Sequence, residues 1–310
     1  MEKIQKILVV SYSQSGQLTE ITDNFIRPLH NVDIDSVSYS PKVPYPFPWT
    51  SGVFFDAMPE SVLETPVELN PITYKHTKYD LIIFAYQPWY LSPSIPANSL
   101  LQDEAFLSRV HNTPVITLIG SRNMWLNSQE SIKNRISKAG GSIAANIPFI
   151  DRTQNQLSAI TILHWALTGK KTRKYNILPK PGVSDEDISF ATEYGKILNE
   201  AIQKNDISNL QSDFLNKGRI KLSTEIIFIE ERAKRLFRIW TSLVIKLGTS
   251  PAKRRWMLLA FKYYLVVALF VVAPIVVSLY QIIVAPFFCK TIVKKKQLYL
   301  RQIDVKCPYL

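Results

Sequence analysis

Cysteine and histidine are both scarce in this chain of 310 residues. Its two cysteines, Cys289 and Cys307, lie near the C-terminal end, so neither a disulfide scaffold nor a catalytic thiol is expected. No metal site is expected either, because the four histidines lack the spacing of a ligand set. They are His30, His76, His111 and His164. With 46% hydrophobic residues, the composition excludes a disordered or collagen-like chain and suits one sizeable domain with an appendage.

Acidic residues are nearly missing from the last third of the chain. Residues 217–310 hold 18 basic and 4 acidic side chains, whereas residues 1–216 hold 19 basic and 21 acidic ones. The excess of positive charge therefore lies in the last third of the chain. Nucleic acid is one usual partner of such charge, but no RNA- or DNA-binding motif accompanies it. We therefore expect no nucleic-acid partner and interpret the charge as a sign of an anionic lipid surface.

The clearest single signal is a run of 27 residues without a formal charge, from Tyr263 to Cys289. About 20 apolar residues suffice to cross a bilayer core. Nine basic residues precede the run and six follow it. We expect this run to form a single spanning helix. Basic flanks on both sides also suit a re-entrant hairpin bent near Pro274, and a buried core helix is the third interpretation of the run. Residues 1–14 lack a signal-peptide pattern, so we expect an inner (cytoplasmic) membrane protein with its N-terminal domain in the cytoplasm.

The segment before this run has the pattern of an amphipathic helix. Apolar residues from Ile229 to Leu247 recur at steps of three and four, while most basic residues fall on other faces. We predict a basic amphipathic juxtamembrane helix over 223–255, followed by a hydrophobic anchor and basic tail over 256–310. The alternative is a helix packed on the globular domain with its basic face in water.

The first 216 residues alternate between strand and helix patterns. Near-continuous apolar runs such as LIIFA and VITLI are typical of a parallel sheet covered on both faces. The predicted strands are Lys6–Val10, Asp33–Val37, Asp80–Ala85, Pro114–Ile119 and Ser142–Ile150. The predicted helices are Gln17–Leu29, Ala97–Val110 and Ser128–Ala139, with Asp185–Lys204 after a linker. This order predicts a doubly wound α/β domain over 1–180, followed by a helical extension over 181–222.

The loop after the first strand, SYSQSGQLT, leads straight into a helix. Hydroxyl groups and free backbone N–H groups at a helix N-terminus form a site for one phosphate. Neither the P-loop nor the dinucleotide fingerprint is matched, and a simple capping turn is the alternative. The candidate phosphate contacts are Ser11, Ser13, Gln14, Ser15, Gly16, Gln17 and Leu18.

Two further loops at the same sheet edge are rich in aromatic residues. PWYLSPSIP follows the third strand and GSRNMW follows the fourth. Aromatic side chains on ligand-facing loops are costly in water unless they cover a flat partner, although ordinary packing would also explain each one. Beside a phosphate turn, they predict a site for flavin mononucleotide, FMN, with Trp89, Tyr90 and Trp125 flanking the ring. The candidate contacts in these loops are Pro88, Trp89, Tyr90, Ser92, Gly120, Ser121, Asn123 and Trp125.

Three residues are candidates for a catalytic role. Arg122 lies in the loop after the fourth strand, where a cation would stabilise negative charge on a reduced flavin or on an enolate. His164 and Asp151 are candidate bases. The alternatives are a packing histidine within ILHWAL and an aspartate that caps a helix.

Four segments together resemble one known family. SQSGQLTEI, PWYLSPSIP, SRNMW and IDRTQNQLSAITILHWALTGKK are similar to segments of the flavodoxin-like aromatases of dialkylresorcinol and flexirubin-type pigment biosynthesis. The resemblance runs from about residue 4 to 180. It implies a flavodoxin-like five-stranded parallel sheet of order 2-1-3-4-5 and FMN-dependent aromatisation of a 2,5-dialkylcyclohexane-1,3-dione to a resorcinol.

The same resemblance implies the partners of the reaction. A ketosynthase and an acyl carrier protein of the same pathway would supply a small hydrophobic substrate, NAD(P)H is a candidate reductant, and a homodimer is expected. The lipid bilayer is the remaining partner, because a substrate with two alkyl chains partitions into membranes. Two other functions stay open at this stage: an electron carrier at the membrane, and a non-catalytic membrane scaffold with the same fold.

Overall fold

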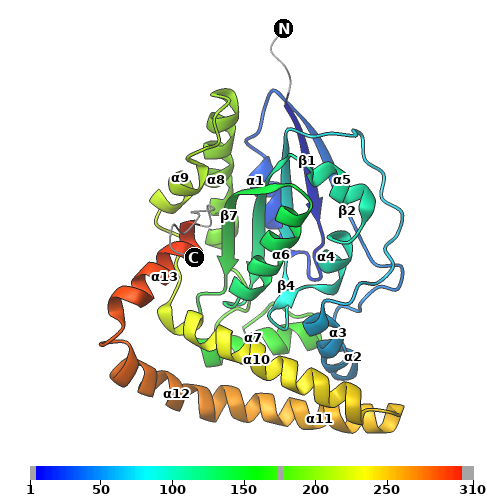
Figure 1. Ribbon diagram of the computed structural model, residues 1–310, viewed down its shortest axis with the longest axis vertical. Coiled ribbons are helices and arrows are strands. Elements are labelled where there is room, and N and C mark those ends of the chain that lie inside the picture. Colours follow the sequence, from blue (N-terminus) through cyan, green and yellow to red (C-terminus); the bar gives the residue numbers. More distant parts are fainter. Residues whose placement is uncertain (1–4, 174–176, 302–310) are drawn as a thin grey trace.

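A five-stranded parallel sheet organises the computed structural model, which describes residues 5–173 and 177–301 (Figure 1). The strands are β1 (Gln5–Ser11), β2 (Val32–Ser38), β3 (Leu81–Tyr86), β6 (Pro114–Ser121) and β7 (Ser142–Ile150). Their spatial order is β2-β1-β3-β6-β7, and every pairing is parallel. Numbered along the chain, this is the order 2-1-3-4-5 of flavodoxin-like doubly wound sheets. The predicted strands and sheet are confirmed.

Alternate residues of each central strand enter two separate cores, as the pleat of a strand requires. Ile7 and Val9 of β1 pack on one face, with α1 (Gln17–Ile26), α8 (Asp185–Gln203) and α9 (Leu210–Asn216). Leu8 and Val10 pack on the other, with α4 (Ile95–Leu100), α5 (Glu104–Val110) and α6 (Leu126–Lys138). The helical extension predicted over 181–222 thus contributes α8 and α9 to the same core as the sheet.

The helix predicted over 97–110 is divided into α4 and α5. Asp103 interrupts it, because its side chain accepts a hydrogen bond from the backbone N–H of Phe106 at 2.7 Å and so begins a new helix. Further elements lie where no regular structure was predicted. They are α2 (Ser51–Asp56), α3 (Met58–Leu63) and the short hairpin of β4 (Pro88–Trp89) and β5 (Ser92–Pro93).

The C-terminal part consists of α10 (Thr224–Leu247), one long apolar helix and α13 (Cys289–Arg301). The apolar helix comprises α11 (Pro251–Val267), a π-helical turn η2 (Ala268–Val272), α12 (Ala273–Leu279) and a second π-helical turn η3 (Tyr280–Val284). It continues through Pro274, so no hairpin bend is found there. Among the described residues, Pro251–Ile283 is the helix long and apolar enough to cross a membrane. Cys307 lies outside the described residues.

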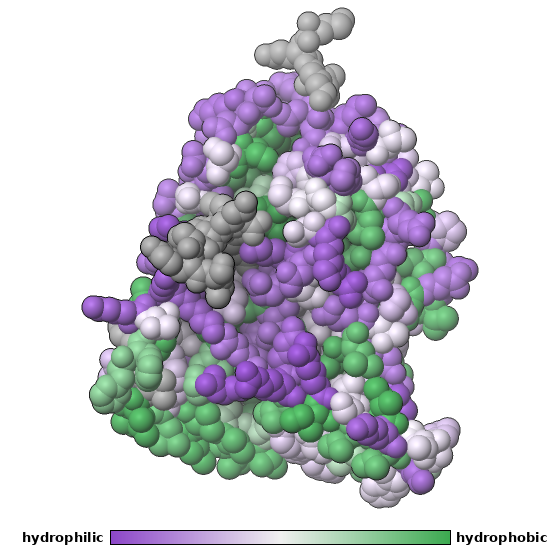
Figure 2. Space-filling view, viewed as in Figure 1, coloured by the Kyte–Doolittle hydropathy of each residue, from purple (hydrophilic) through white to green (hydrophobic). Residues whose placement is uncertain are grey.

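The two faces of this tail differ in polarity. In Figure 2, apolar side chains gather along the lower edge of the molecule over α11 and α12, and hydrophilic ones lie above them over α10. Of the residues in the most apolar stretch of the long helix, only 6% are buried inside the protein. The tail therefore presents a continuous apolar surface beside a charged one.

Candidate functional site

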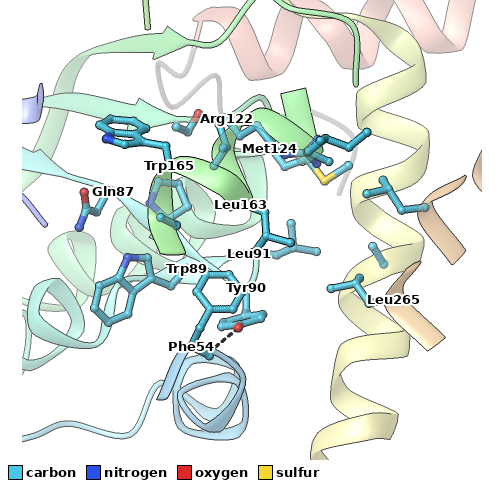
Figure 3. A pocket seen from close by; sticks show the side chains of 18 of the residues that line it. Phe54, Gln87, Trp89, Tyr90, Leu91, Arg122, Met124, Leu163, Trp165 and Leu265 are labelled. Carbon is cyan, nitrogen blue, oxygen red and sulfur yellow. Dashed lines mark hydrogen bonds between the residues drawn. The ribbon is translucent and has the colours of Figure 1, made fainter. Parts of the chain in front are cut away.

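A cavity of about 960 Å³ lies at the carboxyl ends of β1, β3 and β6 (Figure 3). Small-molecule sites occupy about 300–1,000 Å³, so this cavity has room for a large cofactor together with a substrate. Its walls come from the three strand-end loops, from α7 (Asn155–Thr168), from α10 and from the apolar helix. It includes the point where the strand order reverses beside β1, which is where ligands of doubly wound sheets bind.

The predicted phosphate turn forms one end of the cavity. Gly16 has φ +85° and precedes α1, and a Cβ at this position would meet nothing within 4 Å. The Ser13 hydroxyl accepts a hydrogen bond from the Leu18 N–H at 3.2 Å. Of the candidates in this turn, Gln14, Ser15, Gln17 and Leu18 line the cavity, while Ser11, Ser13 and Gly16 shape the turn without lining it. The first N–H groups of α1 have no partner within the helix, as at any helix start.

Two glutamines of this turn are engaged elsewhere through their side chains. Gln17 donates to the Val183 carbonyl and accepts from the Val183 N–H, both at 3.0 Å, so the amide fixes the chain that leads into α8. The Gln14 amide donates to the carbonyls of Tyr45 and Pro46 at 3.1 and 2.9 Å. Gln17 therefore offers a ligand only its backbone, and Gln14 ties the turn to the proline-rich segment 41–50.

That proline-rich segment closes part of the cavity. The Trp49 N–H donates to the Ala166 carbonyl of α7 at 2.8 Å, and the Phe47 ring meets the Trp165 ring edge-on at 6.1 Å. Phe47 and Trp49 both line the cavity. The segment thus joins the phosphate turn to α7.

The aromatic residues of the third-strand loop point in two directions. The Trp89 ring lies 5.1 Å from the rings of both Tyr45 and Trp49 and is on the cavity wall. Tyr90 also lines the cavity but on the side of the tail: its hydroxyl donates to the Phe54 carbonyl at 2.5 Å and its ring contacts Phe237 of α10 (Figure 3). Burial raises the pKa of Tyr90 well above its usual value, so the phenol stays neutral.

Three predicted flavin contacts, Ser92, Asn123 and Trp125, do not line the cavity. Trp125 is only 1% exposed and belongs to the core beneath α6, together with Leu8 and Ile132. Ser92 is buried in the β4–β5 hairpin, where it pairs with Trp89. The expectation that Trp125 flanks a flavin ring is therefore corrected, because its indole fills the space between the sheet and α6.

Three buried polar atoms at this edge have no hydrogen-bond partner in the described part of the chain. They are Nε2 of Gln87, Oγ of Ser121 and Oδ1 of Asn123. Gln87 and Ser121 line the cavity, as do Pro88 and Gly120. Leaving such groups unpaired costs about 1–3 kcal/mol each, so a ligand with donors and acceptors along one edge would relieve the cost. Gln87 is not among the predicted contacts, although its position directly after β3, at the same sheet edge, indicates a ligand-facing residue.

Arg122 is a fixed cation on the cavity wall. Its Nη1 donates to the carbonyl and to Oδ1 of Asn155 at 2.9 and 2.7 Å, and the Asn123 amide also donates to that Oδ1 at 2.8 Å. Burial lowers the pKa of Arg122 to about 10, while Asp151 acts in the opposite direction. The guanidinium is therefore still charged at neutral pH.

The two candidate bases differ in position. His164 lies on α7 and lines the cavity. Asp151 is 3% exposed and does not line it; its carboxylate accepts hydrogen bonds from Ser158 Oγ at 2.7 Å and from the Thr153 N–H at 2.9 Å. Asp151 therefore organises the start of α7, and His164 is the candidate base that reaches the cavity.

The rest of the wall is apolar with a positive bias. Its charged side chains, among the described lining residues, are those of Arg122, Arg232 and Lys262, and no carboxylate joins them. Leu163 and Leu265 mark the apolar sides contributed by α7 and the long helix (Figure 3). This combination suits an apolar molecule that carries or develops negative charge.

Comparisons with known proteins add two likenesses of fold. No protein-family model matches the chain, and no curated protein matches it. A flavoprotein from Lactobacillus acidophilus NCFM, solved in complex with FMN, aligns at a TM-score of 0.39 with 13% identity over 46% of this chain and 93% of its own. A flavodoxin from the domain Archaea aligns at 0.35 with 13% identity over 64% and 99%. Because both scores are low, the fold class rests on the observed strand order.

Proposed function

We propose that the cavity binds FMN and that the protein is a flavin-dependent oxidoreductase acting on a small apolar substrate. The observation that carries this proposal is the pair of unpartnered polar atoms of Gln87 and Ser121 on the cavity wall, beside a phosphate-type turn. A flavin ring has donors and acceptors along one edge, and its ribityl phosphate needs an anion site at a distance from that edge. The two features occur here at the same sheet edge.

The residues fit the parts of the cofactor as follows. The N–H groups at the start of α1 would hold the phosphate, with Ser15 at the wall. Gln87, Ser121 and backbone groups near Gly120 would bond the polar edge of the ring, and Trp89 would cover one face. When bound, FMN supplies a two-electron hydride acceptor.

For the substrate, the proposal extends to aromatisation of a 2,5-dialkylcyclohexane-1,3-dione to a dialkylresorcinol. The reaction removes one hydride and one proton from the ring. Arg122 would stabilise the enolate form of the dione, and His164 would accept the proton. The apolar walls of α7 and the long helix would hold the alkyl chains.

An electron carrier needs no substrate room, whereas this cavity has an apolar part lined by the tail helices. That space favours an enzyme over a carrier.

The test begins with the absorbance spectrum of the detergent-purified full chain and identification of what denaturation releases. FMN at one equivalent per chain supports the proposal, and turnover of a dialkylcyclohexanedione to a resorcinol supports the named reaction. A chain that carries no flavin and does not bind added FMN overturns both. Bound FMN without turnover of the dione overturns the reaction alone.

A further inference from the structure

The helix α10 is fixed on the globular domain and cannot lie in hydrocarbon. Glu230 in its first half is fully buried and accepts a hydrogen bond from the Asn127 N–H of α6 at 2.7 Å. Further along, the Thr241 hydroxyl donates to Met58 Sδ of α3 at 3.3 Å. The helix also carries Arg235 and Arg238 on its outer side, and charges of this kind are costly in a bilayer core.

The long apolar helix lies antiparallel beside α10 along its length (Figure 1). Near its start, Arg254 forms ion pairs with Asp56 and Glu60 of the domain, and farther along the ring of Tyr264 lies 5.0 Å from that of Trp240 of α10. Near its end, Tyr280 stacks at 4.1 Å on Phe228, at the beginning of α10, and Gln281 donates to Glu225. A helix of 33 residues is about 50 Å long, and here both ends contact the surface of one domain.

After the apolar helix, α13 returns to the same domain. Lys295 forms an ion pair with Glu231 of α10, and Gln211 Nε2 of α9 donates to the Leu300 carbonyl at 2.7 Å. Leu300 also packs against both sheet cores. If the apolar helix crossed the bilayer, α13 would lie beyond a hydrocarbon layer of about 30 Å and none of these contacts would exist.

The outer face of the tail has the chemistry of a membrane-surface segment. Its large apolar side chains are exposed, and they include Val267 at 52%, Val271 at 54%, Ile275 at 58%, Ile282 at 72% and Phe287 at 81%. Exposed basic residues lie before the apolar stretch at Lys253 and Arg255, after it at Lys290 and Lys294, and on the neighbouring helix α10 at Arg235 and Arg238. An apolar face with a cationic border binds the headgroup region of anionic lipids.

We propose that the apolar helix lies in one leaflet of an anionic bilayer, parallel to the membrane plane, and that the globular domain and α13 are on the same side of the membrane. The helix meets the length and composition of a spanning segment, but its contacts at both ends and the return of α13 favour an in-plane position. This proposal is independent of what the cavity binds.

Labelling of single cysteines in the full chain tests this proposal, because it shows on which side of the membrane each cysteine lies. In a Cys289→Ser, Cys307→Ser background, Gln297→Cys marks α13 and Lys204→Cys marks the end of α8; both native residues are exposed. A membrane-impermeant maleimide is applied to sealed inside-out and right-side-out vesicles from expressing bacteria. We expect both cysteines to label in the same vesicle type only. Labelling of the two in opposite vesicle types overturns the proposal, as does recovery of the protein in the soluble fraction.

Binding to a defined lipid surface is the second test. The detergent-purified chain is mixed with vesicles of phosphatidylglycerol and phosphatidylcholine and floated on a density gradient. Val271→Glu with Ile275→Glu should reduce bound protein at least about tenfold, because two exposed apolar groups that would enter the lipid become charged. The control is Val43→Glu, on an exposed residue of the proline-rich segment, which should bind as the wild type does. Equal binding of all three proteins overturns the proposal.

Discussion

Gly195 of α8 lies directly against the backbone of Phe25 in α1: a Cβ at Gly195 would be 2.0 Å from the Phe25 carbonyl oxygen. This close approach lets α8 cover the sheet face beside α1, so that Tyr194 and Leu198 enter the core. The helix predicted to follow the linker is therefore a structural part of the α/β domain.

Gly195→Ala should destabilise the protein by about 1–3 kcal/mol or more, because the clash is with backbone and cannot be relieved by a rotamer change. Urea unfolding of the purified chain measures the effect. Lys196→Ala, on the exposed side of the same helix, should change the free energy of unfolding by no more than about 0.5 kcal/mol. A Gly195→Ala protein as stable as the wild type would show that α1 and α8 are not this close.

Ser13→Asp combined with Ser15→Asp should abolish FMN binding, because two carboxylates would repel the phosphate at the start of α1. Fluorescence titration with FMN measures the loss. Ser108→Asp with Ser189→Asp adds the same charge at exposed serines elsewhere and should bind as the wild type does. Flavin retained by the first variant would remove the phosphate site from this loop.

Arg122→Gln should make the reduction potential of bound FMN more negative. The buried guanidinium favours negative charge on the reduced ring, and a neutral amide does not. Dye-coupled reductive titration reports the potential, with Lys138→Gln on the outer end of α6 as the control. An unchanged potential in Arg122→Gln would place the guanidinium too far from the ring to act on it.

Glu230 should make stability depend on pH. Burial raises its pKa to about 7 from the ordinary 4.5, in spite of the N–H donors of residues 125–127. Its favourable contribution is complete below pH 4.5 and is lost as pH rises through about 7, since the folded state must then hold a buried charge. The Glu230→Gln protein should therefore gain stability relative to wild type as pH rises from 4.5 to about 7, by up to about 1.4 kcal/mol per pH unit, and the difference should level off above pH 7.

Unfolding in urea at pH 5, 6, 7 and 8 measures this difference. Glu200→Gln, an exposed site at the end of α8, is the control and should follow the wild type at every pH. A Glu230→Gln protein that also follows the wild type throughout would mean that Glu230 titrates normally.

Arg254→Ala should release the start of the apolar helix from the domain. Arg254 Nε donates to Asp56 Oδ1 at 2.7 Å, and its Nη2 donates to Glu60 Oε1 at 2.8 Å. Limited proteolysis should cut faster near Gly248, between α10 and α11. The neighbouring Arg255 is exposed, so Arg255→Ala should be cut at the wild-type rate; equal rates for all three proteins would contradict the role of the Arg254 contacts.

The sheet was predictable because each strand is a short apolar run between turn signals. The cavity was predictable only in part. Trp125 follows β6 in an aromatic loop, but sequence position does not tell whether its indole faces a ligand or the core. The hydrogen bonds between Gln17 and Val183 join residues 166 positions apart, and no local sequence pattern predicts them. The apolar residues of α7 lie all around the helix, so its cavity face has no periodic signature.

The cavity wall is formed by residues far apart in the sequence, from Gln14 in the first loop to Val276 in the apolar helix. During synthesis, the whole sheet and α7 leave the ribosome before that last wall exists. The cavity side of α7 is then apolar surface in water until α10 and the apolar helix, which complete the wall, arrive. A chain cut short after α9 should therefore fold its sheet and still aggregate through the face that its own tail normally covers.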